Sequence, residues 1–225
     1  MSLERSRQLY AAALTEYAPD RIIGIDEVGV GAWAGPVYVC GVSTFPDFTL
    51  PGLRDSKKVL EKARPQLCTD ILAVPGLEPA TAFCSSQCVD MLGIAHAVAK
   101  LTLSAIELVT ERIITERCLI VVDGDRQPPR SGRYPQNYRV LAIPKADDIV
   151  PAVMAASNLA KLLRDKRMRE IEAGNPELYG PFAFAKNKGY GTEQHRLALK
   201  RLQPTDQHRL SYRPVRQALT YGKTV

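Results

Sequence analysis

Two short apolar segments that each end in an acid constrain the fold of this chain most strongly. Residues 22–26 and 119–123 consist mainly of Ile, Leu and Val before a terminal Asp, which is typical of buried β-strands. Further strands are predicted at 37–42, near 80–84 and at 138–143, and helices at 3–17, 89–114, 151–171 and 192–202. Because strands and helices alternate, we expect a mixed α/β sheet. The strands at 22–26 and 37–42 are expected to pair antiparallel at the centre of the sheet. Residues 174–191 are expected to form a loop, and a proline-bounded tail is expected after residue 202.

Composition excludes several classes of protein. The 225 residues are 45% hydrophobic and 24% charged, and the mean hydropathy of −0.14 is ordinary for a soluble globular chain. No apolar stretch approaches the ~20 residues of a membrane span, so no membrane partner is expected. A signal peptide is not recognisable, which predicts a cytoplasmic protein. No linker separates two cores, so we expect one domain over 1–225, with an N-terminal helix in about 1–20 and a C-terminal helical extension in about 192–225.

The five cysteines form no CxxC pair, and we expect free, buried thiols. Cys84 and Cys88 are four residues apart and could share a helix face as metal ligands. Without a nearby histidine that alternative is disfavoured.

The net charge of +6 is unevenly distributed. Residues 161–216 contain thirteen Lys and Arg against six Asp and Glu, so the last third carries the whole positive excess. A basic segment of this kind suits a polyanion such as nucleic acid. Solvated helix faces alone would produce the same pattern.

Acids from separate chain segments are predicted to meet where the strands end. Asp26 and Glu27 close the first strand, Asp123 closes a later one, and Asp147 and Asp148 follow another. Clustered carboxylates repel one another and need a cation, and ligands that are all oxygen favour Mg²⁺ or Mn²⁺. The alternative is that these are turn and helix-capping acids, with one of the last two capping the helix near 150.

Three loops add features of a phosphate-binding surface. The Gly29-Val-Gly31 turn allows close approach to the main chain. The segments 55–58 and 186–191 place lysines beside a hydroxyl and an aromatic ring, which suits phosphate binding and stacking on a sugar or base. For Tyr190 taken alone, half-buried packing is the favoured interpretation.

Taken in order, these motifs resemble ribonuclease HII over about residues 21–219. The resemblance is carried by Ile25-Asp-Glu-Val-Gly-Val-Gly31, Ala34-Gly-Pro-Val37, Leu53-Arg-Asp-Ser-Lys-Lys58, Val122-Asp-Gly124, Ile143-Pro-Lys-Ala-Asp147, Ala155-Ala-Ser157, Ala160-Lys161, Phe184-Ala-Lys-Asn-Lys-Gly-Tyr-Gly-Thr192-Glu-Gln-His195 and His208-Arg-Leu-Ser-Tyr-Arg-Pro-Val215. Each motif alone is weak, but the ordered set is specific. It implies a ribonuclease H-like sheet of about five strands flanked by helices.

The resemblance also implies roles for individual residues. The metal-binding and catalytic acids are Asp26, Glu27, Asp123 and Asp147, whereas Asp148 matches no family acid. The main chain of Gly29, Val30 and Gly31 is expected to sense the 2′-hydroxyl of a ribonucleotide, and Tyr190 to pack on the neighbouring sugar. The implied phosphate contacts are Lys57, Lys58, Lys161, Arg164 and Lys188.

Two positions depart from the family pattern. Val30 stands where the family normally has arginine, which removes a charge near the cleaved bond. Ala146 stands where a glycine normally precedes the fourth acid. The segment 174–181 is somewhat longer than usual and is expected to be a surface loop.

The implied activity is two-metal-ion hydrolysis of the RNA strand of RNA/DNA hybrids, and cleavage 5′ of ribonucleotides embedded in duplex DNA. Its products carry 5′-phosphate and 3′-hydroxyl ends. We expect a monomer, and the sequence indicates no protein partner. Two alternatives stay open, namely a different nuclease on the same fold, such as a junction resolvase, and a non-catalytic hybrid-binding protein.

Overall fold

The computed structural model describes residues 1–128, 134–135 and 137–221. The chain divides into two compact units. Unit 1 comprises residues 1–27, 39–82 and 99–162, and unit 2 comprises residues 28–38, 83–98 and 163–225. The expected C-terminal extension includes residues 222–225, which lie outside the described residues. Each unit is described by itself.

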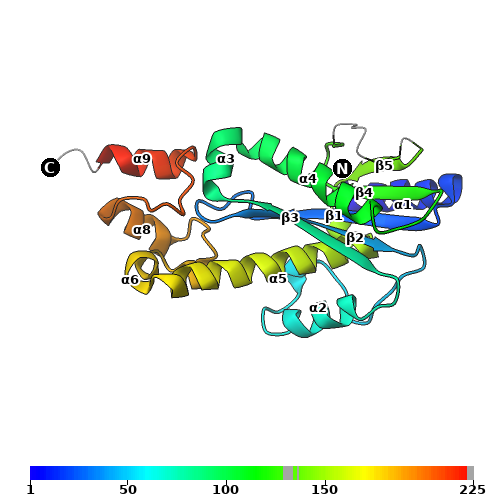
Figure 1. The fold of residues 1–225 in the computed structure, drawn as a ribbon, viewed down its shortest axis with the longest axis horizontal. Helices are drawn as coiled ribbons and strands as arrows, with labels where there is room; N and C mark the ends of the chain where they lie inside the picture. Colours follow the sequence, from blue (N-terminus) through cyan, green and yellow to red (C-terminus); the bar gives the residue numbers. More distant parts are fainter. Residues whose placement is uncertain (129–133, 136, 222–225) are drawn as a thin grey trace. The chain divides into compact units, whose positions relative to one another are not determined.

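A five-stranded sheet with the order β3-β2-β1-β4-β5 forms the centre of unit 1 (Figure 1). Its strands are β1 (Arg21–Val28), β2 (Val37–Thr44), β3 (Glu78–Cys84), β4 (Cys118–Asp123) and β5 (Arg139–Ile143). The predicted strands and the central position of β1 are confirmed. β1 pairs parallel with β4, and β4 pairs parallel with β5, so these three strands end at the same edge.

The helices of unit 1 cover the apolar residues of this sheet. They are α1 (Leu3–Tyr17), α2 (Arg64–Leu72), and most of α4 (Ile94–Thr110), followed by the first half of α5 (Pro151–Gly174). The short 3₁₀ helices are η1 (Ser56–Lys58) and η2 (Ala146–Asp148). The mixed α/β fold with flanking helices is therefore as predicted.

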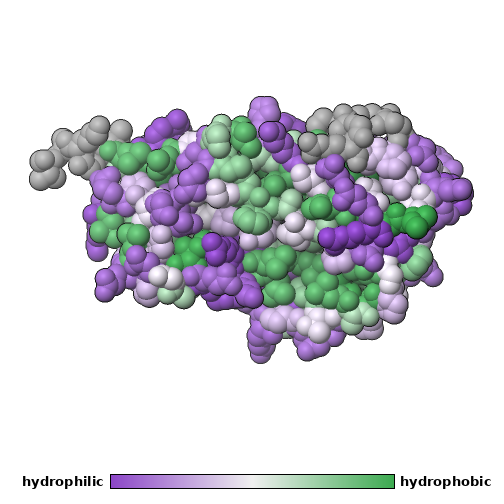
Figure 2. Space-filling model, viewed as in Figure 1, coloured by the Kyte–Doolittle hydropathy of each residue, from purple (hydrophilic) through white to green (hydrophobic). Residues whose placement is uncertain are grey.

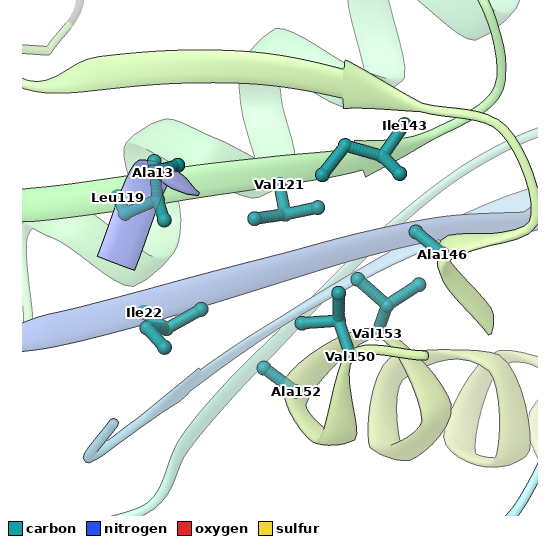
Figure 3. Close-up of a cluster of buried hydrophobic side chains, with 9 residues drawn as sticks. All are labelled: Ala13, Ile22, Leu119, Val121, Ile143, Ala146, Val150, Ala152 and Val153. Carbon is teal, nitrogen blue, oxygen red and sulfur yellow. The ribbon is translucent and has the colours of Figure 1, made fainter. Parts of the chain in front are cut away.

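One core cluster runs along strands β1, β4 and β5, from Ile22 and Leu119 near the start of their strands to Ile143 at the end of β5 (Figure 3). It gathers side chains from α1, β1, β4, β5, η2 and α5, including Val121, Ile143, Ala146 and Val150. Ala146 is fully buried there and directly precedes Asp147, so apolar packing holds the backbone that carries this acid. Its φ is not positive, which explains why a methyl group is tolerated where the family pattern has glycine.

Gly24 lets helix α5 approach strand β1. A Cβ built at this position would lie 2.2 Å from the backbone of Ala152 and Val153, so no larger residue fits. Gly24 lies two residues before Asp26, and the contact thus places the start of α5 next to the acidic end of the strand.

Unit 2 contains α3 (Ser86–Leu92), the C-terminal half of α5, and a series of short helices. These are α6 (Pro176–Tyr179), η3 (Gly180–Phe182), α7 (Phe184–Asn187), α8 (Glu193–Arg201) and α9 (Arg213–Tyr221). Aromatic side chains, among them Phe182 and Phe184, form its apolar core with Met168 and Val215.

Three secondary-structure predictions were wrong. The helix expected over 89–114 is broken into α3 and α4, because Gly93 has φ 75° and ends α3. Residues 174–191, expected as loop, contain α6, η3 and α7, with Asn175 capping α6 through Leu178 N. The third is α2, which lies where no helix was predicted, whereas the C-terminal helical extension expected from about residue 192 is present as α8 and α9.

The cysteine prediction holds for three residues and fails for two. Cys40, Cys68 and Cys118 are free and buried. Cys84 and Cys88 form a disulfide rather than free thiols or a metal site. The four-residue spacing brings them together across the end of β3 and the first turn of α3, where their Cα atoms are 5.7 Å apart.

Among the described residues, no single helix is long and apolar enough to cross a membrane. Taken together, α3 and α4 have the length and composition of a membrane span, but the two helices are bent by 110° relative to each other. Figure 2 shows hydrophilic residues interleaved with patches of hydrophobic ones on the face in view.

Candidate active site

The end of the sheet in unit 1 brings the predicted acids together. Asp26 follows Ile25, which pairs with Val122 of β4, so Asp26 and Asp123 occupy neighbouring ends of parallel strands. Asp147 lies in η2, four residues after β5 ends at Ile143. Asp26 and Asp147 are buried, and Glu27 and Asp123 are half-buried.

Hydrogen bonds orient three of these carboxylates. Asp26 Oδ1 accepts from Glu27 N at 2.8 Å, and Asp123 Oδ1 accepts from Ala146 N at 2.7 Å. Asp147 Oδ2 accepts from Lys57 Nζ at 2.8 Å. Each carboxylate is therefore held by a different donor.

Burial and mutual repulsion raise the pKa values of Asp26, Glu27 and Asp123. Burial raises the pKa of the Asp26 carboxyl well above its ordinary value, and the charges of Glu27, Asp123 and Asp147 raise it further, while a hydrogen bond from Ser157 lowers it. Burial and the nearby Asp123 charge also raise the pKa of Glu27. For Asp123, burial and then Asp147 raise the pKa.

The donor set fits a hard divalent cation. Four carboxylates with no histidine or cysteine among them are oxygen ligands of the kind that Mg²⁺ and Mn²⁺ take. A cation beside them would offset the repulsion among their negative charges. Across the described residues, no group of three or more His, Cys, Asp or Glu side chains lies in an arrangement that could already hold a metal ion. Asp26, Glu27, Asp123 and Asp147 are the residues that would hold such ions.

The Asp55-Ser-Lys-Lys58 segment lies against the acid cluster and is held by hydrogen bonds that involve Asp55 and the buried Arg64. Asp55 caps η1 by accepting from Lys57 N at 2.9 Å. The buried Arg64 guanidinium donates to Ser56 O at 2.8 Å and to Val59 O at 2.9 Å. This anchoring directs Lys57 to Asp147, and the Lys58 ammonium to Asp148. Asp148 is thus paired with a lysine at the edge of the cluster.

Sequence reasoning assigned no role to two residues that support this site, Ser157 and Asn158. Ser157, which bonds Asp26, is within 2.9 Å of Ser56 Oγ. The fully buried Asn158 donates to Arg54 O at 2.8 Å and to Met154 O at 2.9 Å. The only signal for them in the sequence was that Ala155-Ala-Ser157 is one of the motifs that carry the resemblance to ribonuclease HII.

The glycine turn belongs to unit 2. Gly29 has φ +91°, which disfavours other residues, whereas Val30 is not among the residues with positive φ. A Cβ at Gly31 would meet no atom within 4 Å, so this side of the turn is open. Val30 O accepts hydrogen bonds from Arg209 at 3.1 Å and from the Tyr212 hydroxyl.

Tyr190, also in unit 2, is half-buried and lies beside the buried Arg164. The Arg164 Cζ atom is 5.2 Å from the centre of the tyrosine ring. The main chain of Tyr190 is held from the other side by a histidine pair, since His195 Nδ1 lies 3.0 Å from Tyr190 O.

Hydrogen bonding determines the tautomers of that pair. Thr205 N donates to His208 Nδ1 at 2.9 Å, so the His208 proton is on Nε2 and is donated to His195 Nε2 at 3.0 Å. His195 then carries its own proton on Nδ1 and donates it to Tyr190 O. The arrangement needs both rings neutral, and burial lowers the pKa of His195 and lowers that of His208 to about 3.

Two predicted phosphate contacts do not match the placement of their side chains. Arg164 has 0% of its surface exposed and donates to Pro36 O and Ala34 O, so it binds the turn from inside rather than facing solvent. Lys188 is buried, with its ammonium donating to Ala185 O. Lys161 is half-buried in unit 1, while Lys57 is exposed and Lys58 largely so.

With this geometry established, comparison with known proteins decides the family. The family model described as Ribonuclease HII matches residues 23–215, which is most of the chain. The chain belongs to the ribonuclease HII family. It is 35% identical to ribonuclease HII of Shewanella loihica over 87% of this chain and 88% of that protein. It is 38% identical to ribonuclease HII of Cupriavidus necator over 90% of this chain and 80% of that protein.

Solved structures support the ribonuclease H-like fold. The ribonuclease H2 of Pyrococcus horikoshii OT3 superposes with a TM-score of 0.72 at 20% identity, covering 90% of this chain and 99% of that one. Bst-RNase HIII in complex with Mn²⁺ superposes with a TM-score of 0.73 at 19% identity, covering 95% of this chain and 73% of that one. As a ribonuclease HII, this chain is a metal-dependent endoribonuclease that cleaves RNA in RNA/DNA hybrids.

Proposed function

We propose that this ribonuclease HII also cuts duplex DNA on the 5′ side of single embedded ribonucleotides, and that its products carry 5′-phosphate and 3′-hydroxyl ends. The observation that carries the proposal is Asp26, a carboxyl that is only 7% exposed and faces three other acids. Charge concentrated in this way suits cations that bind a phosphodiester group.

We assign the catalytic and metal-binding roles to Asp26, Glu27, Asp123 and Asp147, with Mg²⁺ or Mn²⁺ as the cation. When bound, two such cations would supply activation of the attacking water and stabilisation of the leaving 3′-oxygen. The chain itself orients the ligands, since Ser157 bonds Asp26, and Ala146 N bonds Asp123. Lys57 offsets part of the negative charge at Asp147.

Recognition of the ribonucleotide is assigned to unit 2. The turn at Gly29, Val30 and Gly31 follows the Asp26-Glu27 pair by one residue in sequence, and its open side offers main-chain groups to a 2′-hydroxyl. The Tyr190 ring is proposed to pack on the adjoining sugar, with Lys57 and Lys58 near phosphates. Because the 2′-hydroxyl distinguishes RNA from DNA, no base-specific reading is expected.

We further propose that the two units work as one catalytic domain, in a monomer that acts in the cytoplasm. The family match supports the first part, because residues 23–215 span both units.

A cleavage assay tests the proposed function. Three duplexes of one sequence are compared: all-DNA, DNA with one embedded ribonucleotide, and an RNA/DNA hybrid, each with Mg²⁺, Mn²⁺ or a chelator. We expect one cut 5′ of the single ribonucleotide, multiple cuts in the hybrid, none in DNA, and no cleavage with chelator. Binding without cleavage in either metal would indicate the non-catalytic alternative. A branched DNA junction is included as a fourth substrate, and its cleavage with none of the duplexes cut would indicate a resolvase.

A further inference from the structure

The turn from Gly29 to Pro36 is held by two buried arginines of unit 2. Arg164 Nε donates to Pro36 O at 2.9 Å, and its Nη2 donates to Ala34 O at 3.3 Å. Its guanidinium also fills the space beside Gly29, where a Cβ would lie 2.1 Å from Nε. Burial lowers the pKa of Arg164 to about 10, so the group stays charged at neutral pH.

Arg209 holds the same turn through two further carbonyls. It is 0% exposed, and its Nε and Nη2 atoms donate to Gly35 O at 3.0 and 2.9 Å. Its Nη1 donates to Val30 O at 3.1 Å and to the Tyr212 hydroxyl at 3.0 Å. Tyr212 in turn donates to Val30 O, so this carbonyl receives two donors.

Burying a guanidinium is costly unless its N–H groups find acceptors. For Arg209, the acceptors are the carbonyls of Gly35 and Val30 in the turn, and these carbonyls in turn receive hydrogen bonds from Arg209. Loss of one Arg209 bond therefore leaves a buried donor and a displaced carbonyl, and the turn cannot reorient without that penalty.

The bonds to Val30 O fix the direction of the next N–H group. In a planar trans peptide the carbonyl and the N–H point in opposite directions, so holding Val30 O on Arg209 and Tyr212 turns Gly31 N–H away from them. Within the described residues this N–H donates no hydrogen bond. A Cβ at Gly31 would meet open space, which leaves room for a sugar.

We propose that Arg209 and Tyr212 are positioning residues that determine ribonucleotide specificity by orienting the Val30–Gly31 peptide toward the 2′-hydroxyl. This inference rests on the proposed function of the turn. It assigns a specificity role to two residues of the C-terminal segment that do not themselves contact the substrate. It also accounts for a working turn without an arginine at position 30, because the buried arginines set its conformation from inside.

Tyr212→Phe tests the inference with the smallest change, since it removes one hydroxyl and keeps the ring. Affinities for the single-ribonucleotide duplex and the all-DNA duplex are measured by fluorescence anisotropy with a chelator present, so that no cleavage occurs. We expect the preference for the ribonucleotide duplex to fall about threefold to tenfold, the value of one hydrogen bond, while affinity for all-DNA stays within about twofold. Tyr179→Phe is the matched control, because its hydroxyl bonds Asp206 and not the turn.

Arg209→Lys provides a second measurement, because it keeps the charge but loses the planar fork. We expect a larger loss of preference than in Tyr212→Phe, whereas Arg216→Lys, the same change at an exposed position of α9, leaves it unchanged. If Arg209→Lys does not fold, as judged by thermal unfolding, Tyr212→Phe decides the matter.

The outcomes separate this inference from the function on which it rests. A wild-type preference that survives in Tyr212→Phe, or an equal loss of affinity for both duplexes, overturns the positioning role alone. A wild-type protein that shows no preference and cuts neither ribonucleotide substrate overturns the proposed function and the inference together.

Discussion

The carboxylates of the acid cluster differ in how much of their charge is compensated. Asp147 has the Lys57 ammonium at 2.8 Å, whereas Asp26 is buried with a hydroxyl and a main-chain N–H as its hydrogen-bond partners. Burial raises the pKa of Asp26, and its three acidic neighbours raise it further. A cation bound at the proposed site would relieve this repulsion, which lowers the stability of the metal-free protein.

Asp123→Asn tests the assigned ligands. We expect it to abolish cleavage, because an amide does not replace a charged oxygen ligand. Unfolding free energy should change by less than about 1 kcal/mol, because the amide oxygen can still accept from Ala146 N and one like charge is removed. Turnover with Mg²⁺ and denaturant unfolding measure the two effects. Wild-type turnover would contradict the assignment.

Asp148→Asn is the matched control for that substitution. Its carboxylate pairs with Lys58 at a partly exposed position, and such pairs contribute little to stability. We expect near-normal turnover. An inactive Asp148→Asn protein beside an active Asp147→Asn protein would show that the neighbouring acid is the ligand.

The His195 and His208 pair gives a pH prediction. Burial, and after it the adjacent His195, lower the pKa of His208 to about 3, against weaker opposing effects of the Thr205 main chain and Asp206. Because the unfolded residue binds a proton near its ordinary value of 6.5 and the folded one does not, stability falls as pH drops from about 6.5 toward 3.

His208→Gln removes this titration. The variant is expected to be less stable than wild type at pH 7, and the difference should shrink by about 1.4 kcal/mol for each pH unit below about 6. Urea unfolding at several pH values measures this difference in unfolding free energy. Titration of the acidic residues does not contribute to the difference, because both proteins contain the same acids. A difference that is constant with pH would mean that His208 is not held neutral.

At the scale of elements, the glycine turn is a short loop whose conformation depends on distant segments. Its carbonyls bind Arg164 of α5 and Arg209 of the segment before α9. The 206–211 segment is itself held by α3, since Asp90 accepts from Leu210 N at 2.7 Å and from Ser211 N at 2.9 Å. The turn therefore keeps its shape although position 30 is valine.

Val30→Arg tests what the missing arginine contributes. The position does not have positive φ and its carbonyl is already bound, so the substitution should not disturb the turn. We expect up to about tenfold tighter binding of ribonucleotide duplexes and a salt dependence steeper by about 0.9 in log–log slope, with unchanged preference for ribose. Salt titrations of affinity measure this. An altered ribose preference would contradict main-chain sensing.

Gly31→Ala is the complementary change in the same turn. The added methyl meets no protein atom within 4 Å, so stability should be nearly unchanged. We expect the preference for ribose to fall, because the methyl occupies the space that a sugar needs. Comparing ribonucleotide and all-DNA duplexes in parallel with Val30→Arg checks both predictions, and an intact preference would exclude approach from this side.

At the scale of the whole molecule, opposite charges are carried by different parts of the chain. Unit 1 contains the four acids, whereas the positive excess of the chain lies in residues 161–216, which belong almost entirely to unit 2. An acidic centre that takes cations and a basic segment that suits a polyanion are the two requirements of a metal-dependent nuclease.

Metal binding should stabilise the whole protein. At a concentration about 100 times the dissociation constant, a cation that binds only the folded chain adds about 2.7 kcal/mol, or roughly 5–10 °C in Tm for a chain of this size. Thermal unfolding with Mn²⁺ and with a chelator measures the shift. It should be lost in Asp26→Asn and kept in Asp148→Asn, and equal shifts in both variants would place the ion elsewhere.

Local pattern was sufficient to predict the strands, the helices α1 and α5, and the candidate acids. Residues 22–26 and 119–123 are apolar enough to be buried whichever elements cover them, and parallel strands bring their terminal acids to one edge. Prediction from local pattern failed where a single residue determined the backbone, as Gly93 does by ending α3 before α4 begins.

Only the tertiary structure decided what the basic residues do. The sequence treats Arg164, Lys188 and Lys57 alike as cations that could bind phosphate, but two are buried on main-chain carbonyls and the third lies on Asp147. The same holds for Arg209, which no sequence pattern distinguished from its exposed neighbours. The charge of a basic residue is fixed by its type. Its hydrogen-bond partner depends on segments brought together from distant positions in the chain. A buried cation must be matched by acceptors, and local sequence does not specify them.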